Sequence, residues 1–321
     1  MSVQVGAVRL PNPVMTASGT AGHGAELAAY FDLSALGAVV VKSVSARPWP
    51  GNPAPRLYPA RAGMLNSVGL QNSGVDAWLQ GDLPPLLATG ARVVVSVWGR
   101  STGDYAEVAA RLAVGLGPGA ANGPSPGRGA VVAVEANISC PNVEDRQRMF
   151  AHSPEAAAEA VGAVERGLQG TGLPVWAKLS PNVTDIVEVA GAVLSAGADG
   201  LTLVNTLMGM ALDPLTGTPV LGGGGGGLSG PALHPVAVRA VHDCRKAFPG
   251  TAIVGVGGVS SGFDAAELLA AGADAVQVGT ATFADPRAPL RVLEDLGSWC
   301  AANGVTAVSQ LQRWLSAGAG R

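Results

Sequence analysis

The sequence predicts an α/β fold, a single-domain (β/α)8 TIM barrel, from two observations. Short apolar, β-branched runs alternate with alanine-rich segments of helical period, which is typical of βαβ units around a parallel sheet. Eight such runs are present, whereas a doubly wound sheet usually has about five or six strands. Because barrels of roughly 200 to more than 400 residues fold as one domain, residues 1–321 are expected to form one domain.

The expected strands are the apolar runs, in chain order 14–17, 38–42, 92–97, 131–138, 174–179, 200–205, 252–255 and 275–279. The expected helices are the alanine-rich segments near 24–36, 104–116, 154–168, 184–196, 235–247, 263–271 and 286–302. Residues 44–90 are rich in Pro, Gly and Asn, and so long a connection is usually functional, so a rim or lid is expected there. Residues 207–230 contain the glycine run 222–227, which is expected to be too flexible for regular structure.

Composition excludes several classes of protein. With 48% hydrophobic and 13% charged residues the chain is not disordered, and a net charge of −3 provides no basic field for nucleic acid or an anionic membrane. No apolar run approaches the about 20 residues that span a bilayer, and the first residues lack a signal-peptide pattern. The cysteines, Cys140, Cys244 and Cys300, are odd in number, which fits a reducing compartment. We therefore expect a cytoplasmic protein with no nucleic-acid or membrane partner.

Polar side chains gather where the expected strands end, and in a barrel the catalytic groups come from these ends and the loops after them. The polar residues after the first six strands include Ser18, Lys42, Ser43, Ser96, Asn137, Lys178, Asn205 and Thr206. The last two strands end in Gly257-Gly258 and Gly279-Thr280, where barrels commonly bind phosphate through backbone N–H groups. Tight βα turns would explain either glycine pair alone. Both pairs, together with the turn at Gly230, predict a phosphorylated ligand.

Two lysines and one cysteine are the candidate reactive groups. Buried lysine is rare without a partner, so Lys42 and Lys178, which follow apolar strands, together predict a site for negative charge, although either alone could be solvated. A lone cysteine is commonly inert, but the polar loop around Cys140 after a barrel strand favours a nucleophile or base. Cys244 and Cys300, in or near helical segments, are expected to be structural.

No metal site is expected. The four histidines show no HExxH or paired spacing, and no CxxC motif is present for zinc or an iron–sulfur cluster. The G-x-S-x-G motif of serine hydrolases is also absent, and the glycine run lacks the setting of a dinucleotide fingerprint.

Eight segments carry a resemblance to a known family, and they cover nearly the whole chain in order. They are NPVMTASG at 12–19, NSVGLQN at 66–72, NISCPN at 137–142, KLSPN at 178–182, NTLMGM at 205–210, GLSGP at 227–231, GVGG at 255–258 and VQVGT at 276–280. In these segments the chain resembles the class 1 dihydroorotate dehydrogenases, most closely the class 1B catalytic subunit, an FMN-binding barrel.

The resemblance implies FMN-dependent oxidation of dihydroorotate to orotate in de novo pyrimidine biosynthesis, with Cys140 as the general base at C5 and hydride transfer from C6 to flavin N5. It implies substrate contacts from Lys42, Asn66, Ser67, Val68, Gly69, Leu70, Asn137, Asn205 and Thr206. It implies FMN contacts from Ser18, Lys42, Ser43, Ser96, Asn137, Lys178 and Val204, with the phosphate at Gly230, Gly257, Gly258, Gly279 and Thr280. Lys178 would stabilise the negative charge of the reduced flavin.

The class 1B resemblance also implies a partner subunit with FAD and an iron–sulfur cluster, and a homodimeric core. The electron acceptor stays open between NAD through that partner, fumarate and a quinone. Three features depart from the family pattern: Ser96 stands where many members carry Asn, residues 143–152 replace a glycine-rich stretch, and the glycine run 222–227 replaces a more varied sequence.

Alternative functions remain open at this point. A related flavin oxidoreductase could act on another dihydropyrimidine such as dihydrouracil, although Lys42 and the asparagines favour an acid. A non-redox barrel, an isomerase or aldolase of a phosphorylated sugar, could use Lys178 to form a Schiff base. A flavin-binding scaffold without turnover is the remaining alternative.

Overall fold

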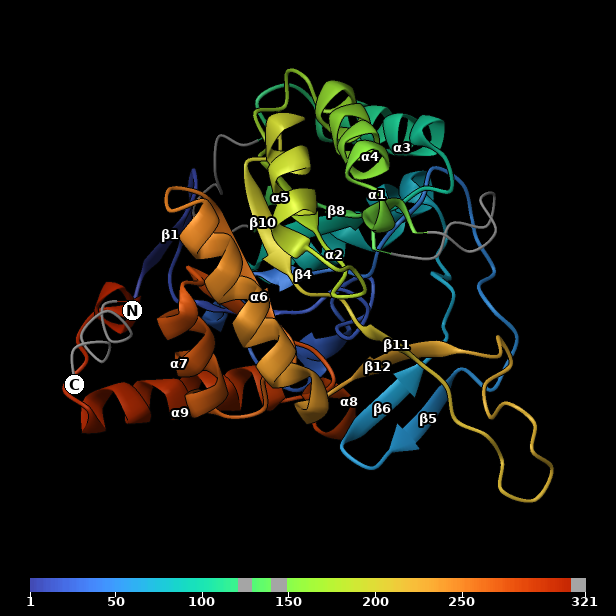
Figure 1. Ribbon diagram of the computed structural model, residues 1–321. Helices are drawn as coiled ribbons and strands as arrows, with labels where there is room; N and C mark the ends of the chain where they lie inside the picture. The colour runs from blue at the N-terminus through green and yellow to red at the C-terminus, as the bar shows by residue number, and fades with distance from the viewer. Residues whose placement is uncertain (121–128, 140–148, 313–321) are drawn as a thin grey trace.

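The computed structural model describes residues 1–120, 129–139 and 149–312, and it confirms the (β/α)8 barrel (Figure 1). Each barrel strand lies at a position that the sequence predicts. They are β3 (Val14–Thr16), β4 (Val39–Val40), β7 (Arg92–Val97), β8 (Ala130–Asn137), β9 (Val175–Lys178), β10 (Gly200–Leu203), β13 (Ala252–Val256) and β14 (Ala275–Val278).

The eight strands are parallel neighbours in the order β3-β14-β13-β10-β9-β8-β7-β4. A parallel bridge between Met15 and Ala38 connects the two outer members, β3 and β4, which brings the sheet round into a barrel. All strand ends that carry the predicted polar residues therefore meet at one mouth.

Helices surround the barrel at six of the seven predicted places (Figure 1). The helices are α1 (Val75–Gly81), α2 (Leu83–Ala88), α3 (Thr102–Leu116), α4 (Pro154–Gly167), α5 (Ile186–Ser195), α6 (His234–Ala247), α7 (Gly262–Ala271), α8 (Ala281–Ala284) and α9 (Ala288–Ala302). Within the described residues, no helix is long and apolar enough to cross a membrane.

The prediction of a helix at 24–36 is wrong. Two 3-10 turns, η1 (Glu26–Ala29) and η2 (Leu33–Ala35), stand in its place. The Glu26 carboxylate accepts hydrogen bonds from the backbone N–H groups of His23 and Gly24, and Asp32 accepts one from Ser34 N. Such local side-chain bonds compete with helical backbone bonds, so the segment turns twice instead of forming one helix.

A four-stranded antiparallel sheet projects from the barrel mouth (Figure 1). Its order is β11-β12-β6-β5, where β5 (Leu57–Ala60) and β6 (Gly63–Asn66) belong to the 44–90 connection, and β11 (Leu207–Gly209) and β12 (Gly226–Ser229) belong to the 207–230 stretch. The expectation that the glycine run has no regular structure is therefore wrong for Gly226 and Gly227. A Cβ at Gly226 would lie 2.4 Å from the Asn66 carbonyl oxygen, so this pairing requires glycine there.

The barrel interior is apolar at its amino-terminal end. The hairpin of β1 (Val3–Val5) and β2 (Val8–Leu10) contributes Val5 and Leu10 to a buried cluster with Met15, Val94 and Trp176 from the barrel strands. This end of the barrel is closed by side chains, so an open site is expected only at the other end.

A polar layer replaces the apolar one nearer the mouth. Side chains two positions apart on a strand face the same side, so the residues that follow Ala133, Trp176 and Ala275 toward the mouth also point inward. These residues are Glu135, Lys178 and Gln277, all at least 97% buried.

Candidate functional site

The floor of the barrel mouth is a group of four polar side chains, of which Glu135, Lys178 and Gln277 are buried and Ser18 is half-buried. Lys178 Nζ donates to Ser18 Oγ at 2.9 Å and lies 3.4 Å from Glu135 Oε1 and 3.5 Å from Gln277 Oε1. Gln277 Nε2 donates to Glu135 Oε2 at 2.9 Å. The predicted residues Lys178 and Ser18 are thus brought together, and the floor presents an ammonium group toward the mouth.

An amide and hydroxyl network lines one side of the mouth. Asn137 Nδ2 donates to Ser43 Oγ at 3.0 Å, and the hydroxyl groups of Ser43 and Ser96 lie 2.8 Å apart. Asn137 Oδ1 accepts from Ser139 Oγ at 3.0 Å and from Asn205 Nδ2 at 3.2 Å. Residues from four strand ends are connected in this way, so their amide groups are fixed before any ligand binds.

Thr206 and Asn66 extend this network into the projecting sheet. The backbone N–H of Thr206 donates to Asn205 Oδ1 at 2.9 Å, and Asn66 Nδ2 donates to the Gly227 carbonyl oxygen at 3.2 Å. A Cβ at Gly227 would lie 2.0 Å from Thr206 Oγ1. The threonine hydroxyl therefore occupies the space that a side chain at position 227 would need. Asn66, Gly227, Thr206 and Asn205 therefore form a continuous path from the rim to the mouth.

The rim segment from Ser67 to Leu70 is held mainly by Asn52 and Trp49. Asn52 Nδ2 donates to Ser67 Oγ at 2.9 Å, and the Asn52 N–H donates to the Val68 carbonyl oxygen at 3.1 Å. Trp49 Nε1 donates to the Gly69 carbonyl oxygen at 2.9 Å. Gly69 and Leu70 have φ values of +70° and +61°, and such strain in a non-glycine residue is typical of functional loops.

Lys42 and Val204 complete the predicted mouth. The Lys42 N–H donates to the Gly22 carbonyl oxygen at 2.9 Å, and the buried Val204 N–H donates to the Val256 carbonyl oxygen at 2.8 Å. The Lys42 charge also affects His23. Burial is the larger cause and repulsion by Lys42 the next, and both lower the pKa of His23 below its ordinary value of 6.5.

The predicted phosphate residues form a cradle without room for side chains. A Cβ added at Gly230 would lie 2.7 Å from Gly63 Cα, and one added at Gly257 would lie 2.7 Å from Ala237 Cβ. A Cβ added at Gly258 would lie 2.9 Å from the carbonyl oxygen of Gly230. All three glycines have positive φ, at +97°, +144° and +69°.

The other side of the cradle is closed by Gly279 and Thr280. A Cβ at Gly279 would lie 3.3 Å from Ala17 Cβ, and Thr280 Oγ1 donates to Ser229 Oγ at 2.8 Å. The cradle lies at the start of α6, which follows the turn η4 (Pro231–Leu233). Backbone N–H groups at a helix start attract an anion, so the cradle fits a phosphate group.

Cys140, the predicted base, lies outside the described residues, as does most of the 143–152 segment. Among the described residues no group of histidine, cysteine and carboxylate side chains could hold a metal ion. Sequence reasoning missed Glu135, Gln277 and Ser139 as site residues. The signal for the first two was present, because charged and amide side chains inside apolar strands are rarely buried without partners.

The chain is similar in sequence to known proteins of one family. The family model described as dihydroorotate dehydrogenase matches residues 1–299. A relative from Geobacter sp. (strain M21), named dihydroorotate dehydrogenase B (NAD(+)), catalytic subunit, is 45% identical over 97% of this chain and 96% of its own. Relatives with the same name from Geobacter sulfurreducens and Desulforamulus reducens are each 44% identical, over 97% of this chain and 96% and 97% of their own.

Proposed function

We propose that this chain, which belongs to the dihydroorotate dehydrogenase family, oxidises dihydroorotate to orotate with FMN as cofactor in de novo pyrimidine biosynthesis. The observation that carries the proposal is the buried Lys178 ammonium at the floor of the mouth, 2.9 Å from Ser18 Oγ. It is combined with an amide network on one side and a side-chain-free cradle for phosphate.

The cofactor assignment is supported by the chemistry of the donors. The cradle residues Gly230, Gly257, Gly258, Gly279 and Thr280 would hold the phosphate of FMN, and the ring would contact Ser18, Lys42, Ser43, Ser96, Asn137, Lys178 and Val204. When bound, FMN supplies the acceptor for the substrate hydride. Lys178 favours negative charge next to the ring, because an ammonium group in a buried site is screened little by water.

The substrate assignment is supported by the fixed amide groups. Asn137 and Asn205 present paired donors and acceptors, which suit the edges of a dihydropyrimidine ring, and Lys42 provides a positive charge for the carboxylate. Asn66, Thr206 and the backbone from Ser67 to Leu70 would enclose the remaining edge.

Cys140 is proposed as the general base that removes the C5 proton. It directly follows Ser139 and lies three positions after Asn137 in the chain, and both of these residues lie in the amide network. A thiolate can remove a proton next to a carbonyl group, and the ordinary pKa of cysteine, about 8.5, predicts a rate of substrate oxidation that rises with pH.

The relatives are named as catalytic subunits of an NAD(+) enzyme. We accordingly propose a partner subunit that carries FAD and an iron–sulfur cluster and passes electrons from this chain to NAD, with a homodimer of this chain as the core.

We further propose that residues 1–321 form one domain with a rim at 44–90, and that the protein is cytoplasmic. The free thiols of Cys244 and Cys300 fit a reducing compartment such as the cytoplasm.

The visible spectrum of the purified chain, before and after anaerobic addition of dihydroorotate, tests the proposal. Flavin bands that bleach with dihydroorotate and persist with dihydrouracil are the expected result. Bands that bleach only with dihydrouracil would show that dihydrouracil is the substrate instead. A protein that takes up no FMN would refute the assignment of FMN as cofactor. For the base, Cys140→Ala should abolish bleaching by dihydroorotate without removing the bands.

A further inference from the structure

Glu135 and Gln277 are buried polar groups that the proposed reaction does not use. Glu135 lies on β8 and Gln277 on β14, and both side chains are fully buried. The strands are far apart in the sequence and are not neighbours in the sheet. Their side chains nevertheless meet inside the barrel, where Gln277 Nε2 donates to Glu135 Oε2 at 2.9 Å.

Stability alone does not account for this arrangement. Removing two charges from water costs several kcal/mol per ion, and a buried ion pair is often no more stable than apolar residues of similar volume. The layer directly below shows that apolar residues can fill this barrel, because Ala133, Trp176 and Ala275 occupy it. A buried carboxylate beside Lys178 is therefore more readily explained by the site above it than by packing.

The hydrogen bonds show what the carboxylate does. An ammonium group has three N–H donors, and Lys178 directs them to Ser18, Glu135 and Gln277. The Gln277 amide has only one orientation that suits both charged neighbours, with its oxygen toward Lys178 and its nitrogen toward Glu135. Gln277 thus fixes the carboxylate, and the carboxylate with Gln277 holds the ammonium from below.

The distances from the Lys178 ammonium to its partners determine how far the Glu135 carboxylate offsets its charge. Lys178 Nζ lies nearer to Ser18 Oγ, at 2.9 Å, than to Glu135 Oε1, at 3.4 Å. The ammonium therefore keeps its short hydrogen bond toward the mouth, while one negative charge stands behind it. A ligand at the mouth experiences the Lys178 charge reduced by the Glu135 charge.

We propose that Glu135, oriented by Gln277, is a positioning residue for Lys178 that sets the redox potential of the bound flavin. The inference rests on the proposed function. The carboxylate holds the ammonium in place and lowers the positive potential at the mouth, so the reduced flavin, which carries the additional negative charge, is stabilised less than it would be by Lys178 alone.

The test is the midpoint potential of the FMN-loaded protein, measured by equilibration with redox dyes, for the wild type and Glu135→Gln. This variant keeps the side-chain shape and removes the charge. We expect the ratio of reduced to oxidised flavin at a fixed ambient potential to rise about tenfold, which is about 30 mV for a two-electron couple. The control is Glu159→Gln, the same substitution on the exposed face of α4, which should leave the potential unchanged.

An unchanged potential in Glu135→Gln, with FMN bound normally, overturns the inference and leaves the proposed function intact. A wild-type chain that takes up no FMN overturns both. If Glu135→Gln fails to fold, Glu135→Asp is measured instead, because it keeps the charge and withdraws the carboxylate from Lys178. Its potential should rise by less than that expected for Glu135→Gln, and an unchanged potential in Glu135→Asp overturns the inference.

Discussion

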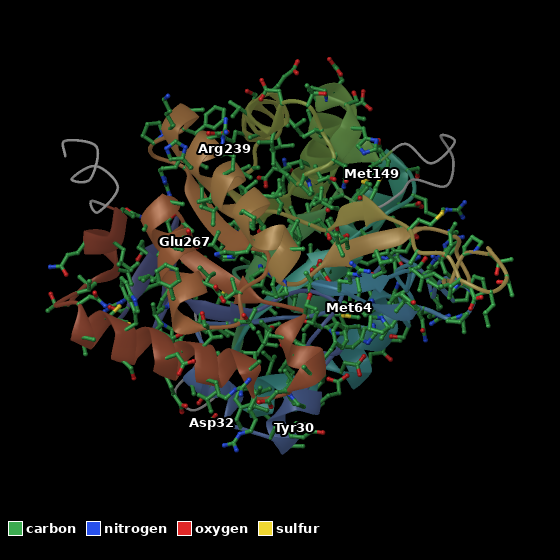
Figure 2. All side chains as sticks on the ribbon, turned by 60° about the horizontal axis from the view of Figure 1, so that its bottom comes forward. Tyr30, Asp32, Met64, Met149, Arg239 and Glu267 are labelled. Atoms are coloured by element: carbon green, nitrogen blue, oxygen red, sulfur yellow. The ribbon has the colours of Figure 1, made fainter. Side chains whose placement is uncertain are left out.

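The imidazole of His234 bridges a carboxylate of α7 and the glycine cradle formed by Gly230, Gly257 and Gly258. Its Nε2 lies 3.0 Å from Glu267 Oε2, and its Nδ1 lies 2.8 Å from the Gly257 carbonyl oxygen. Figure 2 labels Glu267 on α7, which packs against α6. A carbonyl oxygen only accepts, so Nδ1 is the donor in the contact with Gly257.

This bridge predicts a role for His234 in binding phosphate. His234→Ala removes the hydrogen bond that fixes the Gly257 carbonyl, a loss of about 1 kcal/mol, so FMN should bind about fivefold more weakly. Riboflavin, which lacks the phosphate, should bind to both proteins equally, as fluorescence titrations of the apoproteins would show. Glu267→Gln, which leaves the Gly257 bond in place, serves as the control. Equal weakening of FMN and riboflavin would contradict a role at the phosphate.

A methyl group added to the cradle should exclude the cofactor phosphate. In Gly258→Ala the new Cβ would lie 2.7 Å from His234 Cβ, at a φ of +69° that alanine rarely adopts. The loop must therefore shift, and we expect FMN affinity to fall at least tenfold. Gly250→Ala is the matched control because nothing lies within 4 Å of its Cβ. Normal FMN content in purified Gly258→Ala would rule out the cradle as the phosphate site.

Acid should destabilise the protein through His23. Burial and the Lys42 charge lower its pKa in the folded state, while Asp82 and Glu26 partly oppose them. The unfolded chain therefore binds more protons than the folded one just below pH 6.5, and the free energy of unfolding falls as the pH falls through this range. His23→Gln should flatten this part of the stability curve in urea unfolding, and His152→Gln, at an exposed site, provides the comparison. A curve for His23→Gln that keeps the wild-type slope would contradict the assignment.

The cysteines should differ sharply in reactivity. Burial, with smaller contributions from Asp243 and Asp185, raises the pKa of Cys244 to about 12, and burial raises the pKa of Cys300. At pH 8 roughly one Cys244 thiol in ten thousand is then ionised, so iodoacetamide should leave both unmodified in the native protein. Mass spectrometry should find one label, on Cys140, and none in Cys140→Ala. Rapid native labelling of Cys244 would show that its helix packs less tightly than described.

The sequence alone determined the barrel and much of its mouth. Each strand is an apolar run that local periodicity reveals. The first six strands are followed by polar residues, as by Ser43, Asn137 and Asn205, and the last two are followed by glycine. The gathering of the glycines was predictable for the same reason, because Gly257 and Gly279 directly follow strands whose ends must meet.

Only the tertiary structure decided which side chains act together. Glu135 and Gln277 lie inside apolar strands and are 142 residues apart, so no local pattern relates them, and their contact depends on closure of the barrel. The sheet that joins β6 to β12 likewise depends on two distant loops, and it gives Gly226 and Gly227 of the glycine run a regular structure that composition argued against. Sequence periodicity depends on residues that are close along the chain. The charge at the floor of this site depends on residues from different strands that meet inside the barrel.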